Sequence, residues 1–121
     1  MDHLFLNVKD GLVAEINGEA AFFYHGCVLR ENEYVLIYLF DPKYVVDYEI
    51  VLHMLGGAVE DVFSKNPVVH HIYISPTYPG NKIHVKCILD LGFKRNSDPK
   101  DRSENGNTFV CGRYDFLWGI E

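Results

Sequence analysis

The fold is decided by the stretch NKIHVKCILDLGF, residues 81–93. Asn81 suits a helix N-cap, because its side-chain oxygen can accept a hydrogen bond from a free amide of the first turn. Gly92 suits the position just after a helix, where the chain adopts a left-handed conformation. The stretch therefore predicts a short helix over Lys82–Leu91, and Phe93 opens the strand that follows.

A longer helix is predicted upstream, over Asp47–Lys65. Asp47 suits its N-cap, and Asn66-Pro67 suits its end. Apolar residues recur at helical spacing along this segment: Tyr48, Val51, Leu52, Leu55, Val59, Val62 and Phe63. Gly56 and Gly57 lie in its middle, where glycine lowers helix stability, so we expect the helix to approach a sheet closely there.

Strands are predicted on both sides of the long helix. Tyr34–Phe40 is rich in β-branched and aromatic residues, and Val68–Ser75 follows the helix. A strand–helix–strand crossover places its two strands parallel, so we expect these two to pair in parallel with the helix on one face. His70 and His71 are neighbours in the second strand and point to opposite faces, so we expect one in the core and one on the surface.

The remaining segments complete a single sheet. The first forty residues predict a meander of four strands: Leu4–Val8, Leu12–Ile16, Glu19–Arg30 and Tyr34–Phe40. Asn17-Gly18 is a strong hairpin signal within it. A closing hairpin is formed by Phe93 and by Thr108–Phe116, around a solvated loop over residues 96–107. The fold class is therefore α+β, with a single mixed β-sheet, two helices and one domain over residues 1–121.

Composition limits the range of functions. The 121 residues include 11 basic and 17 acidic side chains, for a net charge of −6, so no nucleic-acid partner is expected. Apolar runs such as Tyr34–Phe40 are too short to cross a bilayer, and Met1-Asp2-His3 lacks the basic start of a signal peptide. We therefore expect a cytoplasmic protein with no membrane partner. Cys27, Cys87 and Cys111 form no Cys-x-x-Cys pair, which favours reduced thiols.

The pattern Asn81-x-x-His84-x-x-x-Ile88-x-x-x-Gly92-Phe93 and the order of elements resemble the GNAT superfamily of N-acetyltransferases. In that superfamily an asparagine opens the helix after the fifth strand, and the helix ends in a Gly-Phe pair. The resemblance covers residues 19–116. It implies a GNAT-like (acyl-CoA N-acyltransferase-like) fold that lacks the two N-terminal helices. It also implies an ancestral reaction, acetyl transfer from acetyl-CoA to an amine, with acetyl-CoA as the possible cofactor.

Two positions depart from the superfamily pattern. The superfamily holds the coenzyme pyrophosphate on backbone amides of a glycine-rich turn before the long helix, whereas residues 41–48 read DPKYVVDY here. Asp47 would occupy those amides with its own carboxylate and repel an anion. Ile88 stands where the superfamily places a tyrosine general acid. We therefore expect an acetyltransferase-like protein with a degenerate cofactor loop and weak or no activity.

A narrower resemblance suggests an alternative function. The small acidic chain, with Asn81 and His84 in its short helix, is similar to reduced GNAT-like proteins of tailed bacteriophages. Some of these proteins are acetyltransferases and others are internal virion proteins. The alternative is thus a non-catalytic, phage-encoded structural or interaction factor, in the host cytoplasm or the virion. Its partner would be another protein or a second copy of the chain.

Four residues are candidates for a functional site. Glu33 begins the strand that carries the general base in a GNAT enzyme, and its carboxylate could accept an amine proton through water; it is equally a solvated turn residue. His84 shares a helix face with Cys87, so the two are a metal pair, a base and its thiol, or a packed pair; no third ligand or orienting acid has a spacing that recruits it. The resemblance assigns Asn81 and Tyr44 to cofactor binding, and Asn81 is also explained as a cap.

Metal binding and aromatic pockets are the remaining possibilities. His25 and Cys27 share one strand face and would bind zinc only if His84 and Cys87 converged on them, which the sequence does not show, so no metal site is predicted. Aromatic side chains along the sheet either pack in the core or line a pocket for a planar or acyl ligand: Phe22, Phe23, Tyr24, Tyr34, Tyr38, Tyr44 and Tyr48.

Overall fold

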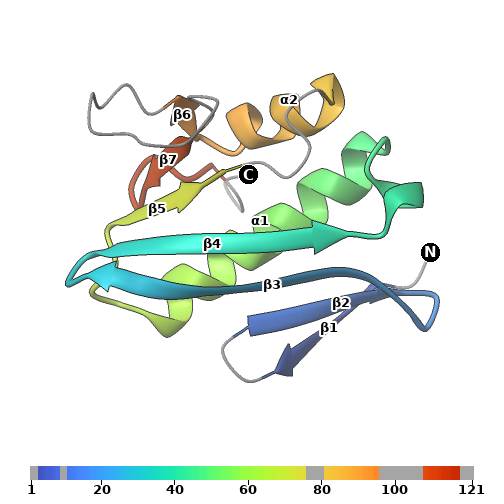
Figure 1. Cartoon of the computed structure of the whole chain (residues 1–121), viewed down its shortest axis with the longest axis horizontal. Helices are drawn as coiled ribbons and strands as arrows, with labels where there is room; N and C mark the ends of the chain where they lie inside the picture. Colours follow the sequence, from blue (N-terminus) through green and yellow to red (C-terminus); the bar gives the residue numbers. More distant parts are fainter. Residues whose placement is uncertain (1–2, 9–10, 76–80, 96–107, 118–121) are drawn as a thin grey trace.

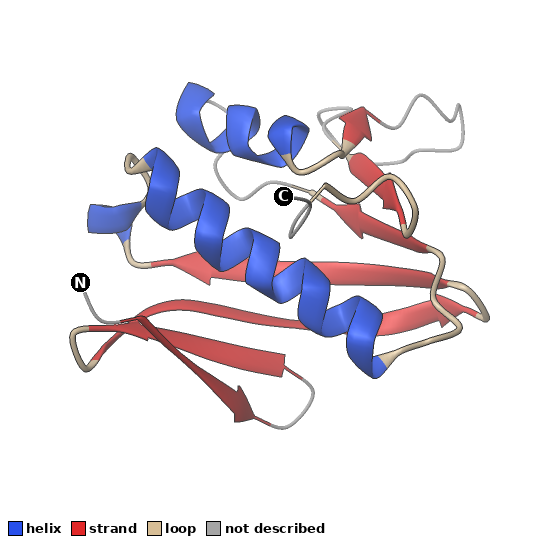
Figure 2. Ribbon diagram, turned by 180° about the vertical axis from the view of Figure 1, so that it is seen from behind, coloured by secondary structure: helices blue, strands red, loops and turns tan. Residues whose placement is uncertain are grey.

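The computed structural model of the chain describes residues 3–8, 11–75, 81–95 and 108–117. These residues form one seven-stranded sheet with two α-helices that pack against the same face (Figures 1 and 2). The α+β class with a single mixed sheet is therefore confirmed. No helix within the described ranges is long and apolar enough to span a membrane.

The strand order across the sheet is β1-β2-β3-β4-β5-β7-β6 (Figure 1). The elements, in chain order, are β1 His3–Val8, β2 Gly11–Ile16, β3 Glu19–Arg30, β4 Glu33–Phe40, the 3₁₀-helix η1 Pro42–Tyr44, α1 Tyr48–Lys65, β5 His71–Ile74, α2 Lys82–Asp90, β6 Lys94–Arg95 and β7 Phe109–Gly112. β4 and β5 are parallel, and every other neighbouring pair is antiparallel. The parallel pairing predicted around the long helix is thus confirmed.

The N-terminal meander has the predicted hairpin turn at Asn17-Gly18. Asn17 and Gly18 both have positive φ, 52° and 82°, as a two-residue hairpin of the type I′ kind requires. The register between β2 and β3 shifts at Ala14/Glu15, which marks a β-bulge.

Helix α1 begins and ends as its capping residues predict. The Asp47 carboxylate accepts a hydrogen bond from the Ile50 amide at 3.2 Å, and Asn66 is the C-cap. A Cβ atom added to Gly57 would lie 2.8 Å from the Phe5 ring of β1. The expected close approach of helix and sheet is therefore confirmed at Gly57.

Arg113 holds the C-terminal end of α1 from a turn that follows β7. Its guanidinium donates to three backbone carbonyls, those of Phe63, Asn66 and Val69, at 3.1, 2.8 and 2.9 Å. It also lies 4.7 Å from the centre of the Phe63 ring. One planar, charged group thus satisfies several carbonyls at a helix end.

Helix α2 also has the predicted ends. The Asn81 side chain accepts from the His84 amide at 3.0 Å, and Gly92 has a φ of +102°. A Cβ atom on Gly92 would lie 2.1 Å from the Asp115 carbonyl oxygen, so the chain passes too closely there for any side chain. The helix itself ends at Asp90, with Leu91 as its C-cap.

Two strand predictions are corrected. β5 begins at His71 rather than Val68, because the amides of His70 and His71 both donate to the Asn32 carbonyl and the chain bends before the ladder. Both histidines are exposed, and Val69 is buried instead, so the prediction of one core histidine was wrong. β7 stops at Gly112 because the Asp115 amide turns back to the Gly112 carbonyl. The loop predicted over 96–107 and the turn over 77–80 lie outside the described residues.

The sheet has one covered face and one open face. Alternate residues of β4, from Tyr34 to Phe40, are buried under the helices. Figure 1 is seen from the open side, where β4 runs in front of α1. By the strand register the open face carries these apolar side chains: Val13, Phe23, Val35, Ile37, Leu39, Tyr73 and Val110. All seven are partly or substantially exposed to solvent.

Candidate functional site

The turn before α1 is hydrogen-bonded within itself. The acceptors are the Asp41 and Asp47 carboxylates and the carbonyls of residues 41, 42 and 44, at 3.0 to 3.4 Å. The donors are five backbone amides of residues 43–50: Lys43, Tyr44, Val45, Asp47 and Ile50. This is the turn in which the resemblance places the coenzyme pyrophosphate, and two carboxylates lie within it.

Asn81 connects this turn to α2. Its side-chain NH₂ donates to the Val45 carbonyl at 3.0 Å, while its side-chain oxygen accepts from the His84 amide at 3.0 Å. Tyr44, the residue before Val45, is half-buried. The structure therefore brings Asn81 close to the turn that contains Tyr44. Both the NH₂ group and the oxygen of the Asn81 side chain already have hydrogen-bond partners within the protein.

His84 lies in the core between α2 and β4. It is fully buried, and its Nε2 is 2.5 Å from the Tyr38 hydroxyl. The imidazole ring also contacts the rings of Tyr38 and Phe40, with centroids 5.4 and 5.8 Å apart. Burial lowers the pKa of His84 to about 4, so the ring is neutral near pH 7. The burial and the contact with Tyr38 favour a packed core histidine, and the role of His84 as a base stays a prediction.

Cys87 lies beside His84 on the same helix and is also fully buried. Its thiol donates to the Tyr48 carbonyl at 3.5 Å. Burial is the main cause that raises its pKa to about 12, and the thiol therefore stays protonated near pH 7. These contacts favour the alternative in which His84 and Cys87 are a packed pair, because a protonated, buried thiol is a poor nucleophile.

Glu33 is not near the other candidates. It begins β4 on the open face, where its carboxylate lies 3.6 Å from Arg30 and its Cα pairs with that of His71. Tyr38, the partner of His84, points to the helix face of the same strand. The turn before α1 follows the far end of β4, roughly 23 Å away at about 3.3 Å per residue. The sheet therefore separates Glu33 from His84, Asn81 and Tyr44.

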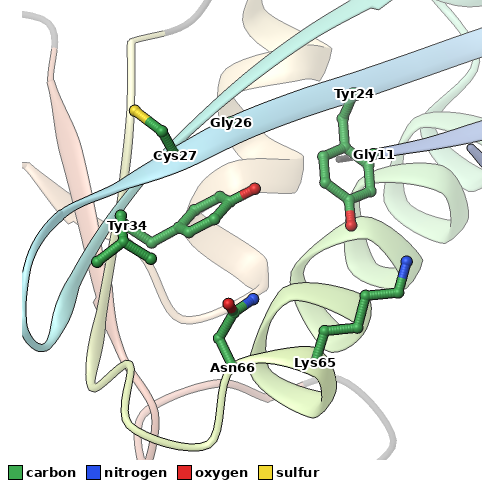
Figure 3. Close-up of a pocket in the computed structure, with 8 residues that line it drawn as sticks. Gly11, Tyr24, Gly26, Cys27, Tyr34, Lys65 and Asn66 are labelled. Atoms are coloured by element: carbon green, nitrogen blue, oxygen red, sulfur yellow. The ribbon is translucent and has the colours of Figure 1, made fainter. Parts of the chain in front are cut away.

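A cavity of about 520 Å³ lies between the sheet and the C-terminal end of α1 (Figure 3). It is lined by Gly11, Tyr24, Gly26, Cys27, Val28, Tyr34, Lys65 and Asn66, and Figure 3 shows the Cys27 thiol pointing away from it. Figure 3 shows the Tyr34 hydroxyl and the Asn66 carboxamide pointing into the same space. Tyr24 and Tyr34 are among the aromatic residues for which the sequence left core packing and pocket lining open; both are buried in the core, and both also line this cavity.

Charged groups meet at one side of this cavity. The Tyr24 hydroxyl donates to the Asp61 carboxylate, and the Lys65 ammonium lies 3.0 Å from the same carboxylate. Burial first, and then the bond to Asp61, raise the pKa of Tyr24 well above its usual value. The cavity thus offers hydroxyl, amide and charged groups between two aromatic rings, which suits hydrogen bonding to a small polar ligand. Sequence reasoning missed Asp61, Lys65 and Asn66; the four-residue spacing of Asp61 and Lys65 on α1 was the available signal.

Two further surface features lie away from these groups. A groove of about 370 Å³ follows the outer side of α2, lined by Lys82, Val85, Lys86, Leu89, Asp90 and Arg95. His25 and Cys27 are exposed on the open face of β3. Within the described ranges, no three His, Cys, Asp or Glu side chains come together in a way that could hold a metal ion.

Comparisons of the sequence give no relative. A comparison with protein-family models finds no match, and a comparison with curated proteins finds none either.

Comparison of the structure with solved structures does find neighbours. The aminoglycoside acetyltransferase AAC(6')-Ib, in complex with ribostamycin and coenzyme A, has a TM-score of 0.68 at 17% identity, over 92% of this chain and 68% of that one. An uncharacterized protein from Bacillus halodurans has a TM-score of 0.68 at 16% identity, over 91% and 63%. A GNAT-family acetyltransferase from Bacillus anthracis has a TM-score of 0.58 at 17% identity, over 84% and 63%. The chain therefore has the fold of the GNAT acetyltransferases.

Proposed function

We propose that the chain is an acetyltransferase-like protein with a degenerate cofactor loop, which transfers acetyl groups from acetyl-CoA to amines weakly or not at all. The observation that carries this proposal is the turn before α1, in which most of the backbone amides already donate hydrogen bonds within the turn. A pyrophosphate is held at a helix N-terminus by free backbone amides. Here five amides of residues 43–50 donate to groups of the turn itself.

The net charge of the same turn opposes an anion, because its one cation, Lys43, is already paired with Glu19 and Asp41. The Asp47 carboxylate stands at the N-cap of α1, where a phosphate oxygen would otherwise accept, and Asp41 caps η1 in the same way. A pyrophosphate would have to displace these carboxylates and also be repelled by them. Asn81 holds the turn in this state through the Val45 carbonyl. The residues present therefore do not fit the coenzyme as the superfamily binds it.

The acid of the superfamily reaction is also missing. Ile88, at the position of the superfamily's tyrosine, is fully buried and has no proton to give. Burial keeps His84 neutral and Cys87 protonated beside it. Glu33 stays a proposed base only, on the opposite face of the sheet from His84.

Calorimetric titration with acetyl-CoA tests this proposal. We expect wild-type protein to give no binding heat at a coenzyme concentration of about 1 mM, which corresponds to less than about 4 kcal/mol of binding free energy. Asp47→Ser keeps a capping oxygen but removes the carboxylate, so it should bind more tightly than wild type. Glu31→Gln removes one charge from the exposed turn between β3 and β4, at the other end of β4 from the turn before α1. This variant should bind acetyl-CoA no better than wild type. A micromolar dissociation constant for wild-type protein would refute the proposal.

A second candidate function is that of a non-catalytic interaction protein, which is also what the similarity to phage-encoded factors implies. The observation that favours it is the row of apolar side chains on the open face of the sheet, including Phe23, Ile37 and Leu39. An assay with labelled acetyl-CoA and an excess of amine tests for residual transfer, and transfer above the rate without protein supports a weak enzyme. An inactive chain fits either candidate, and association through the open face is then the result that supports the interaction protein.

A further inference from the structure

The open face of the sheet carries a continuous apolar surface. Phe23 and Leu39 are directly opposite each other on β3 and β4, and Ile37 lies in the next row. Their side chains are 36%, 54% and 50% exposed. Partly buried apolar residues extend the surface over the neighbouring strands: Val13, Val35, Tyr73 and Val110. A soluble monomer rarely exposes a contiguous apolar patch of this kind.

Strand β4 is apolar on both of its faces. Its sequence, EYVLIYLF, contains no polar residue after Glu33 apart from two tyrosines, and both tyrosines are buried under the helices. A strand with one solvated face alternates apolar and polar residues, while a strand covered on both faces reads as a continuous apolar run. The sequence of β4 is therefore typical of a strand that is covered on both faces. In the described part of the chain, the helices cover one face and nothing covers the other.

We propose that the open face is the interface between two copies of this chain, packed sheet against sheet. Pleated sheets pack face to face about 10 Å apart with interdigitated side chains, so a like surface is a suitable partner. At about 4.8 Å between strands and 3.3 Å per residue, the whole open face of β2 to β5 and β7, its polar margins included, has a planar footprint of roughly 500 Å² per copy. The pair therefore buries roughly 1,000 Å² or more, which is the size at which specific interfaces begin.

Charge does not oppose this packing, although each copy has a net charge of −6. Within β3 and β4, the rows that carry Phe23, Ile37 and Val35 contain no acidic side chain, and their one titratable side chain besides the Cys27 thiol is His25, opposite Ile37. Glu33 lies at the margin of the face, 3.6 Å from Arg30. Repulsion between the two copies therefore acts between distant surfaces, where salt screens it. This interface does not depend on acetyl transfer or on the turn before α1.

Cys27 is a built-in reporter of this face. It is exposed on β3, opposite Val35, whereas Cys87 and Cys111 are buried and burial raises the pKa of each to about 12. A thiol reagent should therefore modify Cys27 in the folded protein and leave the other two thiols alone. Packing of a second copy over β3 and β4 covers Cys27, so its rate of modification should fall as protein concentration rises.

Two measurements test the proposal: sedimentation equilibrium and the rate of Cys27 labelling. Both are made at protein concentrations from about 1 µM to 1 mM. We expect a transition from 13.9 kDa to twice that mass, with slower Cys27 labelling over the same concentration range. Leu39→Lys places a charge in the centre of the interface and should weaken dimerisation at least tenfold. Leu89→Lys is the matched control, since Leu89 is 46% exposed on α2, and it should dimerise as wild type does.

Folding is checked by the urea midpoint of each variant, and Leu39→Thr is measured beside Leu39→Lys because threonine suits a strand and should weaken dimerisation less. A mass of 13.9 kDa at every concentration would overturn the proposal and leave the face to a different protein. A dimer that Leu39→Lys does not weaken, or whose Cys27 is labelled equally fast at every concentration, would also overturn it, because the interface would then lie elsewhere.

Discussion

Lowering the pH from 8 to 5 should destabilise the protein, because His84 must become protonated on unfolding. The ring is fully buried, with its Nε2 beside the Tyr38 hydroxyl and Phe40 against its side. Burial lowers the pKa of His84 from 6.5 in the unfolded chain to about 4. Between these two values the unfolded state binds more protons than the folded state, so stability falls as the pH falls.

The expected loss follows from the two pKa values. A shift of one unit corresponds to 1.36 kcal/mol, so the shift from 6.5 to about 4 amounts to about 3 kcal/mol when complete. At pH 5 about 2 kcal/mol of this should already be lost. The effect is fully absent above the unfolded pKa and grows as the pH approaches 4. For a domain of this size that is a substantial part of the total stability.

Urea unfolding at pH 8, 7, 6 and 5 measures this loss as a shift of the midpoint. His84→Gln removes the titrating ring and keeps a polar group facing Tyr38, so its free energy of unfolding should vary less between pH 7 and 5. His70→Gln is the matched control at an exposed histidine and should keep the wild-type dependence. If wild-type protein were equally stable at pH 5 and pH 8, or if His84→Gln kept the full dependence, His84 would not be a neutral core residue. Its prediction as a base would then regain support.

Three further predictions concern the ends of the helices, each measured as a urea midpoint. Asn81→Ala should cost about 1 to 2 kcal/mol, because it removes the cap of α2 and the bond to the Val45 carbonyl, whereas Asn81→Ser should recover most of the cap. Gly92→Val should cost more than about 1 kcal/mol, since a Cβ there meets the Asp115 carbonyl; an unchanged midpoint would exclude the positive φ. Arg113→Lys should cost about 1 to 3 kcal/mol, because lysine cannot bond three carbonyls in one plane, and equal stability would show that the guanidinium bonds do not matter.

Local signals explain why the helices were predictable. Capping depends on a side chain and the amides two or three residues away, so Asp47 and Asn81 marked the starts of α1 and α2 before any tertiary contact was known. Gly92 marked the end of α2 for an equally local reason, the left-handed backbone. The crossover rule then gave the parallel pairing of β4 and β5.

Strand ends depended on contacts that the sequence does not place. Val68–Ser75 reads as one strand, but the Asn32 carbonyl accepts from both His70 and His71 and bends the chain before β5. Arg113 lies close to Phe63 in space and far from it in sequence, so its role at the end of α1 has no local signal. Such boundaries are decided by tertiary partners rather than by propensity.

For the candidate site residues too, some placements follow from local sequence patterns and others depend on tertiary contacts. Strand periodicity alone shows that Glu33 and Tyr38 point to opposite faces of β4, because they are an odd number of residues apart. That His84 meets Tyr38, and so lies across the sheet from Glu33, depends on where α2 packs. The cavity beside α1 was predictable only through its aromatic rings, since nothing in the sequence places Lys65 and Asp61 against Tyr24.

The continuous apolar run of β4 indicates a strand covered on both faces, but the described part of the chain covers only one of them. Leu36, Tyr38 and Phe40 account for one apolar face of β4, and the two helices cover them. Val35, Ile37 and Leu39 repeat the pattern on the other face, with Phe23 and Tyr73 on the neighbouring strands. Full burial of a large apolar side chain stabilises by about 1.5 to 3 kcal/mol, and side chains that are 36% to 54% exposed, such as Phe23 and Leu39, still forgo part of this, so a second layer over this face would be favoured.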